Sequence, residues 1–155
     1  MGTQVSNEND DAHSEEEIKL IIDASQKGGV IDDTERGIIQ NAIDFSEILA
    51  HEVMIPRQDI KCLYKGQTFD EALEFVKSNN HTRFPLCDKD KDHILGMIHI
   101  RDMLEFNPQN GEQYVLKKLA RKVLFVPENK SISDILHEMM SKRIHMACLL
   151  YTSPS

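Results

Sequence analysis

The sequence predicts an α+β fold in which a β-α-β-β-α unit occurs twice, preceded by a helical segment. Short apolar segments typical of strands alternate with amphipathic helical segments from residue 60 to residue 104, and the same order begins again at residue 123. The chain has 155 residues, 40% of them hydrophobic, so it can bury a core without a disulfide or a metal. Together these observations exclude a small disulfide scaffold.

Two helices are predicted before the first repeat. Ser14 and Glu17 have the spacing of a capping box, and isoleucines at helical spacing follow them until Gly28-Gly29 ends the run. Asp32 and Glu35 form a second box, which marks the start of the next helix. The polar, acidic residues before Ser14 have little to bury, and they predict a disordered leader.

The first repeat is predicted from its periodicity and its turn residues. Apolar side chains recur at helical spacing after Thr68, whereas the segments on either side of that helix are short and rich in strand formers. The expected elements are a strand over Ile60–Tyr64, a helix from Thr68, strands over Arg83–Cys87 and Ile94–Ile100, and a short helix over Arg101–Leu104.

The second repeat begins 63 residues after the first, with a strand over Val123–Pro127 and a helix from Ser131. After a slip of one residue, Met146-Ala147-Cys148 is expected to correspond to Phe84-Pro85-Leu86 of the first repeat, and the third strand and closing helix do not follow. The basic segment Tyr114–Lys122 is interpreted as a helix with a solvated face, and contact with phosphate, lipid headgroups or a partner is the alternative.

Composition excludes several classes of protein. The formal charge is −8, but six of the acids lie in residues 1–17, so the rest of the chain is nearly neutral and is not expected to bind nucleic acid. No apolar run is long enough to span a bilayer. The three cysteines, Cys62, Cys87 and Cys148, lie far apart in the sequence and are expected to be reduced.

No motif for catalysis or metal binding is complete. Asp88–Asp92 has the alternating carboxylates of a calcium loop, but histidines stand where that loop needs glycine and glutamate, so a charged hairpin turn is predicted. His51-Glu52 and His137-Glu138 each lack the second histidine of a zinc helix. The chain is therefore not expected to be an enzyme or to hold a metal of its own.

The segment Gly96–Asp102 carries the clearest indication of a ligand. A glycine within a strand permits close approach of another backbone, and a carboxylate in the first turn of a helix can accept hydrogen bonds from two ribose hydroxyls. The free N–H groups of such a helix also favour a phosphate nearby. An aspartate at this place can equally steady the helix, so the segment alone leaves both roles open.

These residues resemble a CBS-domain pair of the CorC/HlyC family, to which the CNNM magnesium transporters are related. The resemblance covers about residues 12–147. It is carried by five stretches in the family's order: His13–Glu17, Gly29–Asp33, Val53–Arg57, Thr82–Leu86 with Gly96–Leu104, and Val126–Glu128 with Arg143–Ala147.

The resemblance implies that an adenosine nucleotide, ATP with magnesium foremost, binds in a cleft of the pair. It implies that Ile55 and Pro56 flank the adenine together with Phe84 and Pro85, that Asp102 holds the ribose, and that Arg57, Arg83 and Arg101 contact phosphate. His99 stands where many CBS sequences have threonine or serine, so the contact made by that hydroxyl is missing.

The resemblance further implies a cytosolic regulatory module of a magnesium or cobalt transport or efflux protein, on the cytoplasmic face of the plasma membrane. Its expected partners are a transmembrane ion-transport domain and a second copy of the chain, paired through the CBS motifs. A structural dimerisation module without a ligand is the alternative. The expected segments are a leader over 1–12, a helical linker over 13–52, a first CBS motif over 53–106, a linker with a basic helix over 107–122, an incomplete second motif over 123–147 and a foreign tail over 148–155.

Overall fold

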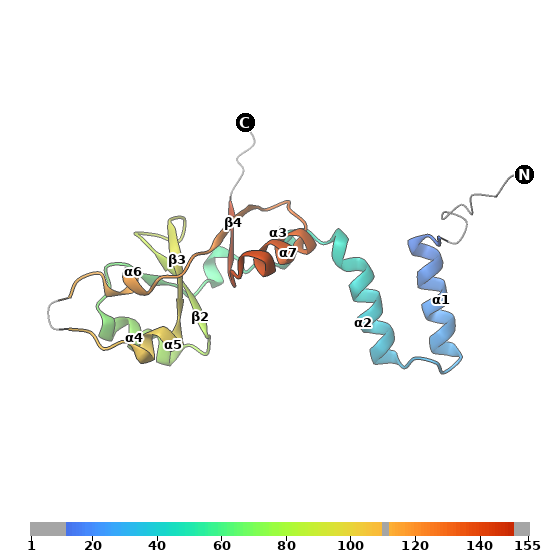
Figure 1. Ribbon diagram of the computed structural model, residues 1–155, viewed down its shortest axis with the longest axis horizontal. Helices are drawn as coiled ribbons and strands as arrows, with labels where there is room; N and C mark the ends of the chain where they lie inside the picture. The colour runs from blue at the N-terminus through green and yellow to red at the C-terminus, as the bar shows by residue number, and fades with distance from the viewer. Residues whose placement is uncertain (1–11, 110–111, 151–155) are drawn as a thin grey trace, which may run out of the picture. The chain divides into compact units, whose positions relative to one another are not determined.

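The computed structural model describes residues 12–109 and 112–150 (Figure 1). These residues divide into two compact units, with the division between Ile48 and Leu49. The predicted disorder of residues 1–11 and the predicted foreign origin of residues 151–155 lie outside the described residues. Within the described ranges, no helix has both the length and the apolar character that crossing a membrane requires.

The first unit contains helices α1 (Glu15–Lys27) and α2 (Asp33–Asp44), followed by the 3-10 turn η1 (Phe45–Glu47). Both helices start at the predicted residues. The Ser14 hydroxyl accepts a hydrogen bond from the Glu17 N–H at 3.2 Å, while the Glu17 carboxylate bonds to His13 in place of closing the box. In contrast, the box of Asp32 and Glu35 is complete.

The second unit begins with the short helix α3 (Ala50–Val53) and the 3-10 turn η2 (Arg57–Asp59), and it contains the first repeat. Strands β1 (Leu63–Tyr64), β2 (Arg83–Cys87) and β3 (Ile94–His99) form a sheet in that order, with β1 and β2 parallel and β2 and β3 antiparallel. The helices of this repeat are α4 (Phe69–Ser78) and α5 (Ile100–Glu105). The α+β fold class and the order of the elements are confirmed.

Strand β1 is shorter than the predicted strand over Ile60–Tyr64. The Ile60 N–H closes the turn η2 by bonding to the Arg57 carbonyl at 3.2 Å. Leu63 pairs with Leu86, so Cys62 would fall opposite Pro85, which has no N–H to give to a ladder. The strand therefore begins only at Leu63.

The second repeat contains β4 (Leu124–Pro127), α7 (Ile132–Lys142) and β5 (Ala147–Leu150), and α6 (Val115–Leu119) precedes it. Strands β4 and β5 are parallel, with Val126 opposite Leu149. Since Leu63 lies opposite Leu86 in the first repeat, the 63-residue offset holds through both strands. The predicted one-residue slip is wrong, and residues 148–150 continue β5.

The two repeats complete each other's cores. Leu116 of α6 packs in the core of the first repeat, and Ala50 of α3 packs in the core of the second. The Ala50 N–H donates to the Lys130 carbonyl at 2.8 Å, so α3 is also hydrogen-bonded to the second repeat. Figure 1 shows α6 beside the first sheet and α3 beside α7. Each repeat therefore needs the segment that precedes the other.

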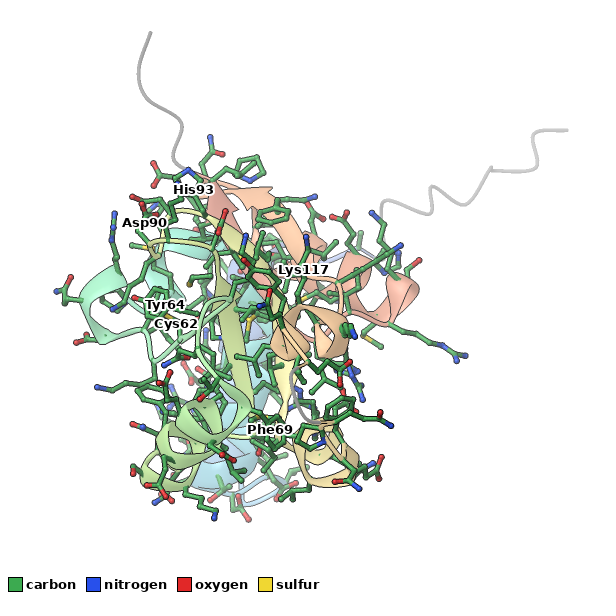
Figure 2. All side chains as sticks on the ribbon, turned by 90° about the vertical axis from the view of Figure 1, so that its left-hand side faces the viewer. Cys62, Tyr64, Phe69, Asp90, His93 and Lys117 are labelled. Carbon is green, nitrogen blue, oxygen red and sulfur yellow. The ribbon has the colours of Figure 1, made fainter. Side chains whose placement is uncertain are left out.

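The segment Asp88–Asp92 forms the predicted hairpin turn between β2 and β3. Its centre is Asp90, whose carboxylate accepts from the Asp92 N–H at 2.9 Å and contacts His93 Nδ1 at 2.8 Å. Figure 2 shows Asp90 and His93 together on this turn. Among the described residues, no group of three or more His, Cys, Asp or Glu side chains could hold a metal ion.

Candidate functional site

Two faces of the first sheet have different roles. Phe84 and Ile98 lie opposite each other on one face and are fully buried in the core. Arg83 is opposite His99, and Pro85 is opposite Met97, so these four residues alternate with the core residues and share the other face. On this second face Met97 is buried and Arg83 is exposed, and this face carries the candidate site.

The residues around Arg121 extend this sheet by one further bridge. The Met97 N–H donates to the Arg121 carbonyl at 2.9 Å, and the Arg121 N–H donates to the Met97 carbonyl at 2.8 Å. A side chain at Gly96 would lie 2.7 Å from the Arg121 carbonyl oxygen, so only glycine permits this approach. The glycine predicted to allow a close backbone approach therefore admits the chain's own linker.

Asp102 lies in the first turn of α5 and is paired with Arg121. Its two carboxylate oxygens accept from Arg121 Nε and Nη2, each at 2.7 Å. The Arg121 guanidinium holds the pKa of the Asp102 carboxyl below its usual value. The carboxylate is therefore ionised at neutral pH, as a group that accepts hydrogen bonds from a diol must be.

His99 takes the place of the hydroxyl that many CBS sequences have at this position. Its Nδ1 accepts a hydrogen bond from the Arg101 N–H at 3.0 Å and so caps α5. Burial lowers the pKa of His99, and the charges of Arg83, Arg121 and Arg101 lower it further. Three guanidinium groups therefore act through their charge on one neutral imidazole. We name Arg83, His99, Arg101, Asp102 and Arg121 the arginine cluster.

A groove of about 750 Å³ adjoins the cluster at Arg121 and Met97. It lies between β3 of the first repeat and the start of β4 and the end of α7 in the second. Among the residues that the structure describes, no acidic side chain lines it. The basic side chains that line it are Arg121, Lys122, Lys142, Arg143 and His145. A cavity of this size and charge suits an anionic ligand of nucleotide dimensions.

Arg143 reaches this groove from an unfavourable backbone position. It ends α7 with a φ of 56° and a ψ of 42°, the left-handed conformation that favours glycine. Its N–H donates to the carbonyls of Met139 and Met140. A long cationic side chain thus stands where glycine would relieve the backbone.

The structure brings together most of the predicted phosphate and ribose residues, but Arg57 lies elsewhere. Arg83, His99, Arg101 and Asp102 belong to the arginine cluster. Arg57 pairs with Asp92 of the hairpin turn. That turn follows Cys87 at one end of β2, and His99 lies opposite Arg83 at the other end. A five-residue strand is about 13 Å long, so Arg57 pairs with a residue about that far from His99.

The four residues predicted to flank an adenine ring lie in different surroundings. Pro85 shares the face of Arg83 and His99, as the strand register shows. Ile55 is 66% exposed, and Pro56 precedes the turn that contains Arg57. The Phe84 ring is fully buried, with its centroid 6.0 Å from that of Phe75, so residue 84 could meet a ligand only through its backbone. Their contact with adenine remains a prediction.

Arg121 is the site residue that the sequence did not single out. The sequence predicts a basic helix over Tyr114–Lys122 that includes Arg121. Helix α6 ends at Leu119, and Arg121 lies in the bridge to β3. At the 63-residue offset Arg121 corresponds to Gln58, directly after Val53–Arg57 of the first repeat, and this correspondence is the sequence signal that could have found it.

The depressed pKa of His99 predicts how stability depends on pH. In the unfolded chain His99 has its ordinary pKa of 6.5, so unfolding takes up a proton as the pH falls below that value, and this histidine then destabilises the fold. Asparagine also caps helices. His99→Asn is therefore expected to lose less stability than the wild type between pH 7.5 and 5.5, measured as the midpoint of urea unfolding.

His93 is the control of opposite sign. The Asp90 carboxylate raises the pKa of His93, so this histidine stabilises the folded chain below its ordinary pKa and the contribution is lost as the pH rises. His93→Asn should therefore lose more stability than the wild type on acidification. Equal pH dependence of the wild type and His99→Asn would contradict the surroundings described for His99.

Known proteins with similar sequences and structures share this fold. The family described as CBS domain matches residues 50–108. The magnesium and cobalt efflux protein CorC of Escherichia coli is 33% identical over 135 residues, which cover 87% of this chain and 46% of that protein. The chain thus spans about half the length of the curated relatives it matches.

Two solved structures extend the comparison. The CBS domain of the bacterial CNNM/CorC family Mg²⁺ transporter is 26% identical, with a TM-score of 0.79 over 90% of this chain and 85% of that chain. The structure named as the same domain in complex with ATP is 23% identical, with a TM-score of 0.68 over 76% of this chain and 83% of that chain. The latter likeness shows the shared fold.

Proposed function

Because the chain belongs to the CorC/CNNM family of CBS-domain proteins, we propose that it is a regulatory module that binds an adenosine nucleotide at the arginine cluster. The observation that carries this proposal is the Asp102 carboxylate in the first turn of α5, which is paired with Arg121 beside a basic groove. One carboxylate and several arginines are the groups that a ribose and its phosphates require.

The chemistry of each group suits one part of the ligand. The Asp102 carboxylate can accept both hydroxyls of a ribose, and the planar guanidinium groups of Arg83 and Arg101 can each bind a phosphate through two hydrogen bonds. Lys122 and Arg143 line the groove beside the cluster and would meet further phosphates. Helix α5 has six residues, so its dipole is short and the arginines supply most of the positive charge.

We infer that ATP is the ligand, in line with the CNNM/CorC CBS domain solved in complex with ATP. Magnesium enters this proposal as the ion that ATP carries on its phosphates. The cluster itself offers guanidinium groups and a single carboxylate, which suit an anion and not a divalent cation. Binding requires no turnover, so ATP should be recovered intact.

For the whole protein we propose that nucleotide binding biases an ion-transport domain, and that the CBS motifs pair with those of a second copy. CorC, at 33% identity, is named as a magnesium and cobalt efflux protein. The segments Leu49–Val53 and Val115–Arg121 each complete the other repeat's core, so a ligand at Arg121 acts on the connection between repeats. A ligand shifts such an arrangement only through unequal affinity for two states.

Isothermal titration with ATP, with and without magnesium, tests the proposed function. The wild type should bind ATP saturably, and Asp102→Asn should weaken binding by about tenfold to a hundredfold, the cost of losing charge-assisted hydrogen bonds to ribose.

Asp92→Asn is the matched control for this titration. It removes an aspartate that also pairs with an arginine, but at the far end of the hairpin. It should bind ATP as the wild type does. If the folded wild type releases no saturable heat with ATP, the proposal fails and the structural dimerisation module takes its place.

A further inference from the structure

We propose that Arg121 is a specificity-determining residue that makes the site select phosphorylated nucleotides over nucleosides. The inference deepens the proposed function and rests on it. In the free chain, Arg121 occupies the carboxylate that ribose needs, and only a ligand that brings phosphate gives Arg121 a new partner. The residues that carry this proposal are Asp102, Arg121, Met97 and the cationic residues that line the groove beside Arg121.

The ion pair between Arg121 and Asp102 has the geometry that a ribose diol would adopt. Nε and Nη2 of Arg121 each donate to a different oxygen of Asp102, and both distances are 2.7 Å. A cis-diol also donates one hydrogen bond to each oxygen of a carboxylate, along the same edge. Two such partners compete for one edge, so ribose binding displaces the guanidinium.

Only the side chain of Arg121 is free to respond. Its backbone is fixed by the two hydrogen bonds to Met97, and Gly96 packs against its carbonyl. The Arg121 side chain is 47% exposed, whereas that of Asp102 is 22% exposed. Arg121 also lines the basic groove. The guanidinium can therefore leave Asp102 and turn into the groove without movement of the chain.

The surrounding charge decides which ligands can displace it. A displaced Arg121 turns toward Lys122 and Arg143, which line the same groove and whose positive charges repel it. A nucleoside offers no charge to compensate, so it breaks the ion pair without replacing it. A nucleotide brings phosphates to Arg121 and to the cationic residues that line the groove. The exchange of one anion for another keeps Arg121 paired, and the site favours phosphorylated ligands.

Titration of the full chain with adenosine, AMP and ATP tests the proposal. The wild type should bind ATP at least about tenfold more tightly than adenosine. Arg121→Gln removes the charge and the fork, so adenosine should bind about threefold to tenfold more tightly than to the wild type, and ATP about tenfold more weakly. Arg121→Lys keeps a charge that holds Asp102 through fewer contacts. Its ratio of ATP affinity to adenosine affinity should therefore lie between those of the wild type and Arg121→Gln.

The controls separate this proposal from the proposed function and from misfolding. Arg36→Gln removes another arginine that pairs with an aspartate, Asp23, in the helical unit, and it should leave the ratio of ATP to adenosine affinity unchanged. Thermal unfolding followed by circular dichroism shows whether each variant folds. If the wild type binds ATP but folded Arg121→Gln and Arg121→Lys keep its ratio within twofold, the selectivity proposal is overturned while the nucleotide site stands. If the wild type binds no nucleotide, both fall.

Discussion

Phe84→Ala is expected to lower the free energy of unfolding by about 3–5 kcal/mol, the usual cost of removing a buried aromatic ring. Phe84 is fully buried on the core face of β2. Its ring contacts those of Phe75 and His81, with centroid distances of 6.0 and 5.9 Å. The cavity left by alanine would lie between α4 and the sheet, where Ala72 and Leu63 are also fully buried.

Urea unfolding followed by circular dichroism measures this loss. Phe84→Leu keeps most of the volume and should cost less than about 1.5 kcal/mol. Leu104→Ala is the surface control, because Leu104 is 72% exposed, and it should change stability by less than about 0.5 kcal/mol. If Phe84→Ala were as mild as Leu104→Ala, the ring would not be in the core and could be available to a ligand.

Gly96→Val is expected to cost about 2–4 kcal/mol of stability and to weaken ATP binding by at least about tenfold. A Cβ at this position would lie 2.7 Å from the Arg121 carbonyl oxygen and 3.0 Å from the Ala120 Cβ. The backbone of Arg121 must then leave β3 and lose both hydrogen bonds to Met97. That movement displaces the guanidinium from Asp102 and opens the arginine cluster.

Gly66→Ala is the matched control, because a Cβ there meets no atom within 4 Å. It should change stability by less than about 0.5 kcal/mol and leave ATP binding intact. Unfolding in urea and titration with ATP measure both properties on the same samples. Gly96→Val with wild-type stability and affinity would show that the bridge between Met97 and Arg121 does not form.

Local sequence signals predicted most of the fold. The caps Ser14, Asp32, Thr68 and Ser131 mark where four helices start, because their side chains bond to backbone N–H groups of the first turn. The strand over Arg83–Cys87 has the predicted bounds. Short-range patterns of this kind depend on neighbouring residues and are therefore visible in the sequence.

Features that depend on distant residues were missed or misplaced. The start of β1 is set by Pro85 on the neighbouring strand, and the register of β5 is set by its pairing with β4. Arg121 gained its role through a bridge to Met97, which lies 24 positions earlier. Similarly, Arg57 and Arg83 were both predicted to contact phosphate. Arg57 pairs with Asp92 in the turn of the β2–β3 hairpin, whereas Arg83 lies opposite His99 at the other end of that hairpin.

The site was predicted in part for the same reason. Arg83, His99, Arg101 and Asp102 come together because they lie on one hairpin and the helix that follows it, a local arrangement. The side chain of Phe84 faces the core because side chains alternate along a strand, and its neighbours Arg83 and Pro85 face the site.

Amide NMR of the isotope-labelled chain during a titration with ATP tests the location of the site most directly. Saturable shifts should concentrate on the amides of residues 97–102 and 120–122, which carry the arginine cluster and its bridge. The amides of the hairpin turn, residues 88–92, should change little. Shifts confined to that turn, or no saturable shift in any residue, would contradict nucleotide binding at Asp102.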